Sequence, residues 1–149
     1  MQSKICVLQV IPNLDVSGAS QGCVDVANFL SEKKYNSYIL THSGPRSTDV
    51  KGYKEKIFYA SVNSKNPLKI LFNVIKIVQL IKKLNITIVH ARSRAPAWSS
   101  YFACAITGTK FIATFHGTYN FNNPLKKYYN SIMLKTNGTI AISEFINDH

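Results

Sequence analysis

Apolar runs and amphipathic segments alternate along the whole chain. The run at 4–11 is apolar and rich in β-branched residues, and a polar loop separates it from the segment 20–34, where apolar residues recur every three or four positions. The first pattern is typical of a buried strand and the second of a helix with one apolar face. The alternation continues to the C-terminus and predicts further strands at 37–43, 56–62, 85–93, 109–117 and 138–143, a polar loop at 44–52, and further helices at 67–84, 95–108, near 124–136 and from 144 onwards.

Two of the helices carry additional signals. Ser20 is a candidate N-cap for the helix at 20–34, although Cys23 stands where a capping box would place Glu. Pro67 opens the long helix at 67–84. Its polar residues form one stripe on an otherwise apolar cylinder, namely Lys69, Asn73, Lys76, Gln79 and Lys83. We therefore expect this helix to be deeply packed, with a lysine edge.

The strands are apolar throughout, rather than alternately apolar and polar. Such strands are typical of parallel sheets that helices cover on both faces. At 149 residues the chain is long enough to bury a core of its own. The pattern therefore predicts one α/β domain over 1–149, with a Rossmann-like, doubly wound, mostly parallel sheet of about six strands and helices on both faces.

The charge of the chain indicates an anionic partner. Eighteen Lys and Arg against seven Asp and Glu give a formal net charge of +11, and this charge attracts phosphates of several kinds. Nucleic acid, an anionic membrane, and a sugar nucleotide or lipid diphosphate all fit. The lysine stripe has two interpretations: the solvent edge of a packed helix, or, together with Lys126, Lys127 and Lys135, a contact with an anionic leaflet.

The cysteines and the N-terminus bear on location. Cys6, Cys23 and Cys104 lie in apolar surroundings at spacings that match neither a disulfide framework nor a zinc ligand set, so buried reduced thiols are expected. Pro12 and Asn13 interrupt the N-terminal apolar run, which argues against a signal peptide. Lysines interrupt every run that might reach the ~20 residues of a membrane span. We expect a cytoplasmic protein. A more specific hypothesis places it peripherally on the inner face of the cell membrane.

Polar residues follow four of the predicted strands at the same end. They form clusters at 13–20, 90–94 and 116–120, and a fourth at Ser143 and Glu144. In open α/β sheets ligands bind outside the carboxyl ends of the strands, so these clusters are expected to converge on one cleft. The alternative is that they are ordinary polar loops, in which a lone histidine is more often a hydrogen-bonding group than a ligand contact.

Four stretches of the chain resemble a known family. The stretches 16–45, 88–98, 111–120 and 129–149 are similar to successive motifs of the N-terminal domain of family-4 glycosyltransferases, retaining enzymes of the two-domain GT-B fold. Members of this family transfer a sugar from a nucleotide-sugar donor to an acceptor, often in the synthesis of lipopolysaccharide or other envelope polysaccharides. The resemblance implies the acceptor-side half of a hexosyltransferase-like enzyme. The C-terminal domain, which holds most of the donor nucleotide in the family, is absent from these 149 residues.

The resemblance assigns the loop after the first strand to the donor diphosphate. The loop residues are Ser17, Gly18, Ala19 and Ser20. Gly18 would let the backbone approach the diphosphate, and the N-terminus of the following helix would offer its free amides. Many relatives have two adjacent glycines and then Glu-Arg-Gly. Here Ser17 replaces the first glycine and a Ser-Gln pair precedes the last one, which removes a charged pair and stiffens the loop.

The resemblance places His116 at the cleft floor, near the transferred sugar, as the catalytic residue. A retaining enzyme without an evident nucleophile mainly needs positioning and stabilisation of a developing cation and a leaving diphosphate, so His116 is cast as a sugar contact rather than a general base. The other expected sugar or acceptor contacts are Arg92, Arg94, Gly117, Thr118, Tyr119 and Asn120. Solvated loop cations are the alternative for the two arginines. Ser143 and Glu144 mark the cleft edge, although Ser143 is better explained as a helix N-cap.

Three functional hypotheses follow. The first is the acceptor-side half of a transferase, inactive alone, whose partners are a nucleotide-sugar donor, a glycan or lipid-linked acceptor and, in a split enzyme, a separate C-terminal donor-binding chain. The second is a non-catalytic remnant or binding module. The third, nucleic-acid binding, rests only on net charge, because an aromatic-rich sheet face and zinc spacings are lacking. No metal and no other cofactor is expected, since nothing resembles the Asp-containing metal motif of the other major glycosyltransferase architecture.

Overall fold

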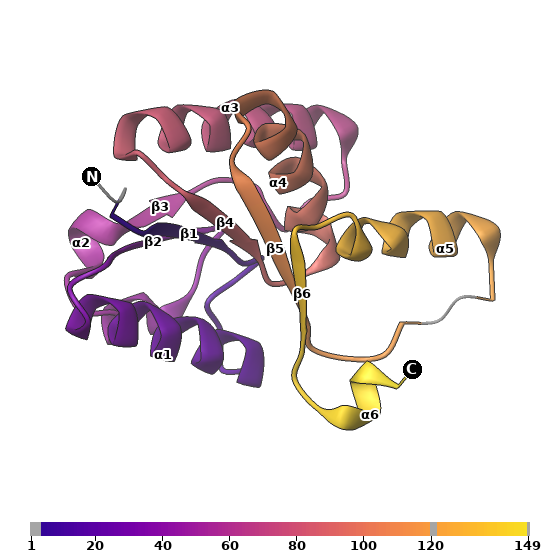
Figure 1. The fold of residues 1–149 in the computed structure, drawn as a ribbon, viewed down its shortest axis with the longest axis horizontal. Helices are drawn as coiled ribbons and strands as arrows, with labels where there is room; N and C mark the ends of the chain where they lie inside the picture. Colours follow the sequence, from indigo (N-terminus) through magenta and orange to yellow (C-terminus); the bar gives the residue numbers. More distant parts are fainter. Residues whose placement is uncertain (1–3, 120–121, 149) are drawn as a thin grey trace.

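The chain forms a six-stranded parallel sheet with helices on both faces (Figure 1). The computed structural model describes residues 4–119 and 122–148. All strand pairs are parallel, in the spatial order β3-β2-β1-β4-β5-β6. The strands are β1 (Cys6–Val10), β2 (Asn36–Thr41), β3 (Ile57–Tyr59), β4 (Ile88–Ala91), β5 (Lys110–Phe115) and β6 (Gly138–Ala141). The predicted Rossmann-like, doubly wound α/β fold is confirmed.

The helices cover the two faces unequally. They are α1 (Gly18–Glu32), α2 (Tyr53–Lys56), α3 (Pro67–Leu84), α4 (Arg94–Thr107), α5 (Pro124–Asn130) and α6 (Glu144–Asn147). In Figure 1, α3 and α4 lie on one face of the sheet, α1 lies on the other, and α5 and α6 extend beyond the edge strand β6. The segment predicted as a polar loop contains a 3-10 helix at Pro45–Asp49. A second 3-10 helix at Ser131–Leu134 continues α5 where the sequence pattern predicts one longer helix.

Alternate residues of each strand point to opposite faces and fill two separate cores. On the α3 and α4 side, Leu8 of β1 belongs to the same buried cluster as Ile77 of α3. On the α1 side, Ile39 of β2 belongs to a second cluster with Val24 of α1. The three cysteines are free and buried, as predicted. Burial on both faces explains why the central strands β1 and β4 do not alternate regularly between apolar and polar residues.

The N-cap of α1 is Ser17, and the prediction of Ser20 is wrong. Ser17 has extended backbone angles, and its Oγ accepts a hydrogen bond of 3.2 Å from the backbone N–H of Ser20. Ser20 lies inside the first turn and is fully buried. Its Oγ lies 3.1 Å from both the carbonyl oxygen of Asn13 and Oδ1 of Asp15. Two serines in one loop offer the same capping chemistry, and the path of the loop decides between them.

Helix α3 has the predicted bounds but is less deeply packed than predicted. Its N-cap is Asn66, and Asn85 ends it in the left-handed conformation. In its N-terminal half, Leu68 is 67% exposed and Phe72 is 68% exposed. Asn73 of the polar stripe is instead buried, and its Nδ2 donates to the carbonyl oxygen of Ser61 over 2.9 Å. The reason is that the apolar surface of α3 is wider than the area that the sheet and α4 cover.

None of the helices in the described part of the chain is both long and apolar enough to cross a membrane.

Candidate functional site at the carboxyl edge of the sheet

The strand order reverses direction beside β1, and a cavity lies there. From β1 the chain builds β2 and β3 on one side and β4, β5 and β6 on the other. Ligands of open α/β sheets bind at such a switch point, outside the carboxyl ends of the strands. A cavity of about 350 Å³ opens at this edge, and it is lined by Ile11, Pro12, Asn13, Asp15, Ser17, Ala19, Arg92, Ser93, His116, Gly117 and Tyr119.

The N-terminus of α1 forms one side of this cavity. The first N–H groups of a helix have no partner within the helix, and Ser17 satisfies one of them. The others, together with the positive end of the helix dipole, favour an anion here. A Cβ atom placed on Gly18 would meet no atom within 4 Å, so there is open space beside the first turn. This geometry suits a phosphate group of a ligand.

Arg92 is a buried cation beside α1. Only 6% of the residue is exposed. Its Nε donates to Oε1 of Gln9 over 2.7 Å, and its Nη2 donates to the carbonyl oxygen of Gly22 over 3.3 Å. Gln9 in turn donates through Nε2 to the carbonyl oxygen of Cys23 over 3.0 Å. Neutral groups therefore hold the guanidinium in place against β1 and α1.

The charge of Arg92 is not balanced by a carboxylate in the described part of the chain. The ion pairs found there join Arg46 to Asp49 and Lys51 to Glu32. Burial lowers the pKa of Arg92, yet a guanidinium keeps its proton in proteins. A buried charge is costly unless it is paired. An anionic ligand in the adjoining cavity would supply the missing charge.

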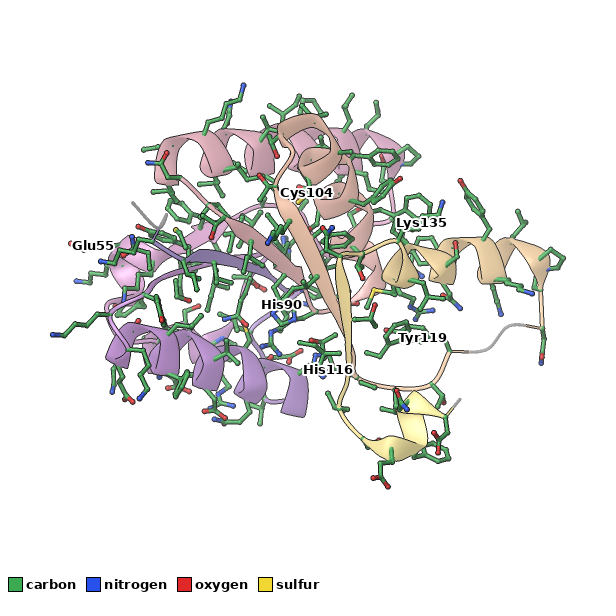
Figure 2. All side chains as sticks on the ribbon, viewed as in Figure 1. Glu55, His90, Cys104, His116, Tyr119 and Lys135 are labelled. Atoms are coloured by element: carbon green, nitrogen blue, oxygen red, sulfur yellow. The ribbon has the colours of Figure 1, made fainter. Side chains whose placement is uncertain are left out.

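Two histidines lie side by side at the ends of β4 and β5 and differ in burial. His90 is 5% exposed, and its Nε2 lies 2.6 Å from Oγ1 of Thr114. Burial, and then the nearby charges of Arg92 and His116, lower the pKa of His90 to about 3. Burial and then Arg92 also lower the pKa of His116. Figure 2 shows both side chains near the centre of the molecule. Both imidazoles are therefore neutral at pH 7.

His116 is the histidine that lines the cavity. It is partly buried, and its Nε2 is buried without a hydrogen-bond partner among the described residues. A buried polar nitrogen without a partner is uncommon in folded proteins. A neutral imidazole can donate or accept one hydrogen bond through this atom, depending on its tautomer. The geometry therefore suits a contact with a ligand hydroxyl.

Tyr119 joins this cavity to a neighbouring one. Its ring packs on Phe115, with centroids 5.3 Å apart, and the guanidinium carbon of Arg94 lies 4.2 Å from its centroid. Arg94 also donates through Nη1 to Oδ1 of Asn130 over 2.8 Å. Arg94, Thr118 and Tyr119 line the second cavity, and Tyr119 lines both.

The structure brings together most of the expected site residues. Ser17, Ala19, Arg92, His116, Gly117 and Tyr119 line the first cavity, and Arg94 and Thr118 line the second. Ser20 is buried behind the loop. Asn120 lies outside the described residues.

Ser143 and Glu144 lie apart from the first cavity, at the start of α6. The Oγ of Ser143 accepts a hydrogen bond of 3.3 Å from the backbone N–H of Ile146. This bond confirms the interpretation of Ser143 as a helix N-cap. Neither residue lines the first cavity.

Gln9 is the site residue that the sequence analysis missed. Its signal was an amide within an otherwise apolar strand, because such a residue must find buried partners. In the described part of the chain, no group of three or more His, Cys, Asp or Glu side chains is placed to hold a metal ion.

Comparisons with known proteins agree with this geometry. Residues 16–149 match the family model "Glycosyltransferase Family 4". The glycosyltransferase from Rickettsia africae ESF-5 is 44% identical, with a TM-score of 0.82, and the match covers 98% of this chain and 38% of that protein. This chain thus spans well under half of the length of that relative. A search of curated proteins finds no match.

Two more distant structures share the fold. The apo form of the lipopolysaccharide outer core galactosyltransferase WaaB is 16% identical, with a TM-score of 0.61, over 96% of this chain and 40% of that one. A putative UDP-N-acetylglucosamine 2-epimerase from Listeria monocytogenes is 9% identical, with a TM-score of 0.66, and the match covers 99% of this chain and 41% of that protein. The sequence motifs, the parallel sheet with its cavity at the switch point and the family match lead to one conclusion: the chain belongs to glycosyltransferase family 4.

Proposed function

We propose that the chain is the acceptor-side domain of a retaining glycosyltransferase, which transfers a hexosyl group from a nucleotide-sugar to an envelope or lipopolysaccharide-type acceptor. The observation that carries this proposal is the single cavity into which the N-terminus of α1, the buried Arg92 and His116 converge. One positive helix end and one unbalanced cation suit a leaving diphosphate. An imidazole with a free nitrogen suits the sugar.

The roles of the residues follow from their chemistry. The backbone beside Gly18 approaches the diphosphate, and Arg92 stabilises the negative charge that grows on the leaving group. Because His116 is neutral, it orients a sugar hydroxyl by a hydrogen bond and does not repel the cation that develops at the sugar. Gly117 leaves space beside it, and Tyr119 contacts the acceptor.

We further propose that these residues do not complete the site. The groups that bind the nucleotide come from a second domain, either in a longer chain or in a separate donor-binding protein. The chain covers 38% of its Rickettsia relative, which supports this proposal. The isolated 149 residues are therefore expected to transfer no sugar.

We also propose a cytoplasmic location with peripheral contact to an anionic membrane. The contact surface is the α3–α4 face, defined by the exposed side chains of Leu68, Leu71, Phe72, Ile75, Phe102 and Ile106. Helix α3 also carries the exposed lysines Lys69, Lys82 and Lys83, and the sequence has no aspartate or glutamate between Glu55 and Glu144. Apolar side chains beside lysines suit a bilayer with negative headgroups.

The test joins this chain to the C-terminal part of the Rickettsia africae glycosyltransferase, beyond the region that the two proteins share. Release of nucleoside diphosphate from a panel of UDP- and GDP-hexoses is measured for the chain, for the fusion and for the fusion with His116→Ala. We expect no turnover by the chain, turnover by the fusion, and a loss on the order of 10²-fold with His116→Ala. His42→Ala is the control, because His42 is exposed and lines none of the described cavities.

Two outcomes would contradict the proposal. Turnover by the 149 residues alone would show that the site is complete without a second domain. An inactive fusion, with the full-length Rickettsia enzyme active on the same panel, would favour a non-catalytic binding module.

A further inference from the structure

A second cavity, of about 510 Å³, lies beside the first one and carries three cations. Lys65 precedes α3, Arg94 begins α4, and Lys126 lies in the first turn of α5. Tyr119 and Tyr129 contribute aromatic walls. Three segments far apart in the sequence therefore each place one positive charge in the lining of this second cavity.

Aromatic rings and an amide hold two of these cations in place. The guanidinium carbon of Arg94 lies 4.2 Å from the ring centroid of Tyr119 and 6.0 Å from that of Tyr129, and Nη1 donates to Asn130. The Nζ of Lys65 lies 5.5 Å from the ring centroid of Tyr129. The Oη of Tyr129 is buried and has no hydrogen-bond partner among the described residues. The wall of the cavity thus contains two cations that aromatic rings hold in place.

No carboxylate among the described residues forms an ion pair with these cations. The described ion pairs lie elsewhere, between Arg46 and Asp49 and between Lys51 and Glu32. The sequence between Glu55 and Glu144, which supplies the whole lining of this cavity, contains no acidic residue at all. Like charges that converge without a counterion repel one another. A multiply charged anion in the cavity would remove this cost.

We propose that this cavity binds a phosphate group of the acceptor, as a phosphomonoester or diphosphate. The inference rests on the proposed transferase function. Arginine forks and lysines are suited to phosphate oxygens, whereas a neutral sugar would not call for three cations. Because Tyr119 lines both cavities, the acceptor phosphate lies next to the place proposed for the transferred sugar. The phosphate belongs either to a soluble phosphorylated glycan or to a lipid.

Geometry connects this cavity to the α3–α4 face. Pro67, two residues after Lys65, lines an apolar hollow of about 470 Å³ together with Leu71 and Phe102. A lipid whose phosphate occupies the cavity would lay its chain along this hollow. A soluble glycan phosphate would leave the hollow empty.

The only tryptophan of the chain reports on this cavity. Trp98 donates through Nε1 to the carbonyl oxygen of Tyr129 over 3.2 Å, and their rings are stacked with centroids 6.1 Å apart. Trp98 fluorescence of the full chain is therefore titrated with glucose 6-phosphate, which carries no alkyl chain, and with glucose as the neutral probe. A second arm uses phosphatidylcholine vesicles with and without phosphatidic acid. We expect a saturable response to the phosphate probes and none to the neutral ones.

Charge-matched variants separate the cavity from net charge. The pair Lys65→Gln and Arg94→Gln is expected to weaken phosphate binding about tenfold or more. The control pair Lys4→Gln and Lys54→Gln removes the same charge from exposed positions outside α3 and α4 that line none of the described cavities. Lys65→Gln alone is a fallback if the double variant melts early, because Lys65 is exposed. The control pair should bind like the unchanged chain.

Each outcome decides the inference. A response to glucose 6-phosphate supports the proposal with a soluble source, and a response only to phosphatidic acid vesicles supports the proposal with a lipid source. Equal affinities for the two double variants, or no saturable response in either arm, would overturn it. The fluorescence titration contains no nucleotide-sugar donor, so its result does not depend on transferase activity. An inactive fusion with intact phosphate binding would contradict only the transferase proposal. An active fusion without phosphate binding would contradict only the proposed phosphate site.

Discussion

At the scale of single residues, two histidines that each lie near the carboxyl end of a strand differ in burial and therefore in the role that each can have. His90 lies inside the sheet against Thr114, with a pKa of about 3, whereas His116 reaches the cavity. The unfolded chain has no such burial, and a histidine there has a pKa near ~6.5. Between about pH 6.5 and pH 3, His90 is protonated in the unfolded state but stays neutral in the folded state. The contribution of His90 to stability is therefore complete above about pH 6.5 and falls as the pH falls towards 3.

We predict that His90→Gln makes stability less dependent on pH. From pH 7.5 to pH 5.0 the free energy of unfolding of the unchanged chain should fall by about 2 kcal/mol through this residue, and the variant should lose that part of the fall. Urea unfolding at the two pH values measures the difference. His42→Gln, at an exposed histidine, is the control. An unchanged pH dependence in His90→Gln would show that His90 has the same pKa in the folded and unfolded states.

At the scale of elements, two helices begin at serines that look equivalent in sequence. Ser17 and Ser93 both have extended backbone angles before α1 and α4. Only the side chain of Ser17 accepts a capping hydrogen bond, from the N–H of Ser20. The cap of α1 also shapes the side of the cavity where the diphosphate is proposed to bind. The hydrogen bond that stabilises the start of α1 therefore also shapes the proposed diphosphate site.

Removing the two serine hydroxyls should have different costs. Ser17→Ala is expected to lower the free energy of unfolding by about 1 kcal/mol, because a backbone N–H loses its partner. Ser93→Ala should change it by only a few tenths of a kcal/mol, since no capping bond is lost. Urea denaturation of both variants at one pH gives the comparison. Equal costs would contradict the assigned caps.

At the scale of the whole molecule, charge and apolar exposure are distributed unevenly. The acidic residues lie in 15–55 and in the last residues from Glu144 onwards, whereas the long central segment carries only cations. The α3–α4 face belongs to that central segment. This asymmetry supports the proposed contact of the α3–α4 face with an anionic bilayer.

The proposed membrane contact predicts which exposed phenylalanine matters. Phe72 on α3 is 68% exposed and Phe29 on α1 is 55% exposed. The two helices lie on opposite faces of the sheet (Figure 1). Phe72→Ser should weaken binding to vesicles with anionic lipid about tenfold or more, since burying a phenylalanine is worth about 1.5–3 kcal/mol. Phe29→Ser should leave this binding unchanged. Vesicle flotation at low and high salt measures both variants. Equal binding by the two variants would place the contact elsewhere.

The sequence by itself determined most of the strands and helices, their order and the fold class. Short-range periodicity decides whether a segment is a strand or a helix, so Pro67–Leu84 is a helix with the predicted bounds, and the continuous apolar strands correctly indicated a parallel sheet. Helix-stop signals are equally local, as Gly108 after α4 shows. The direction of the parallel strands is also enough to predict that the polar clusters lie at the carboxyl edge of the sheet.

Only the tertiary structure decided which residues share a site. Gln9 and Arg92 are 83 positions apart, and their hydrogen bond exists because β1 and β4 are neighbours in the sheet. The exposure of Phe72 likewise depends on how much of α3 the sheet and α4 cover. Periodicity along the chain reports which face of an element is apolar. It does not report what packs against that face, because that depends on contacts between distant parts of the chain.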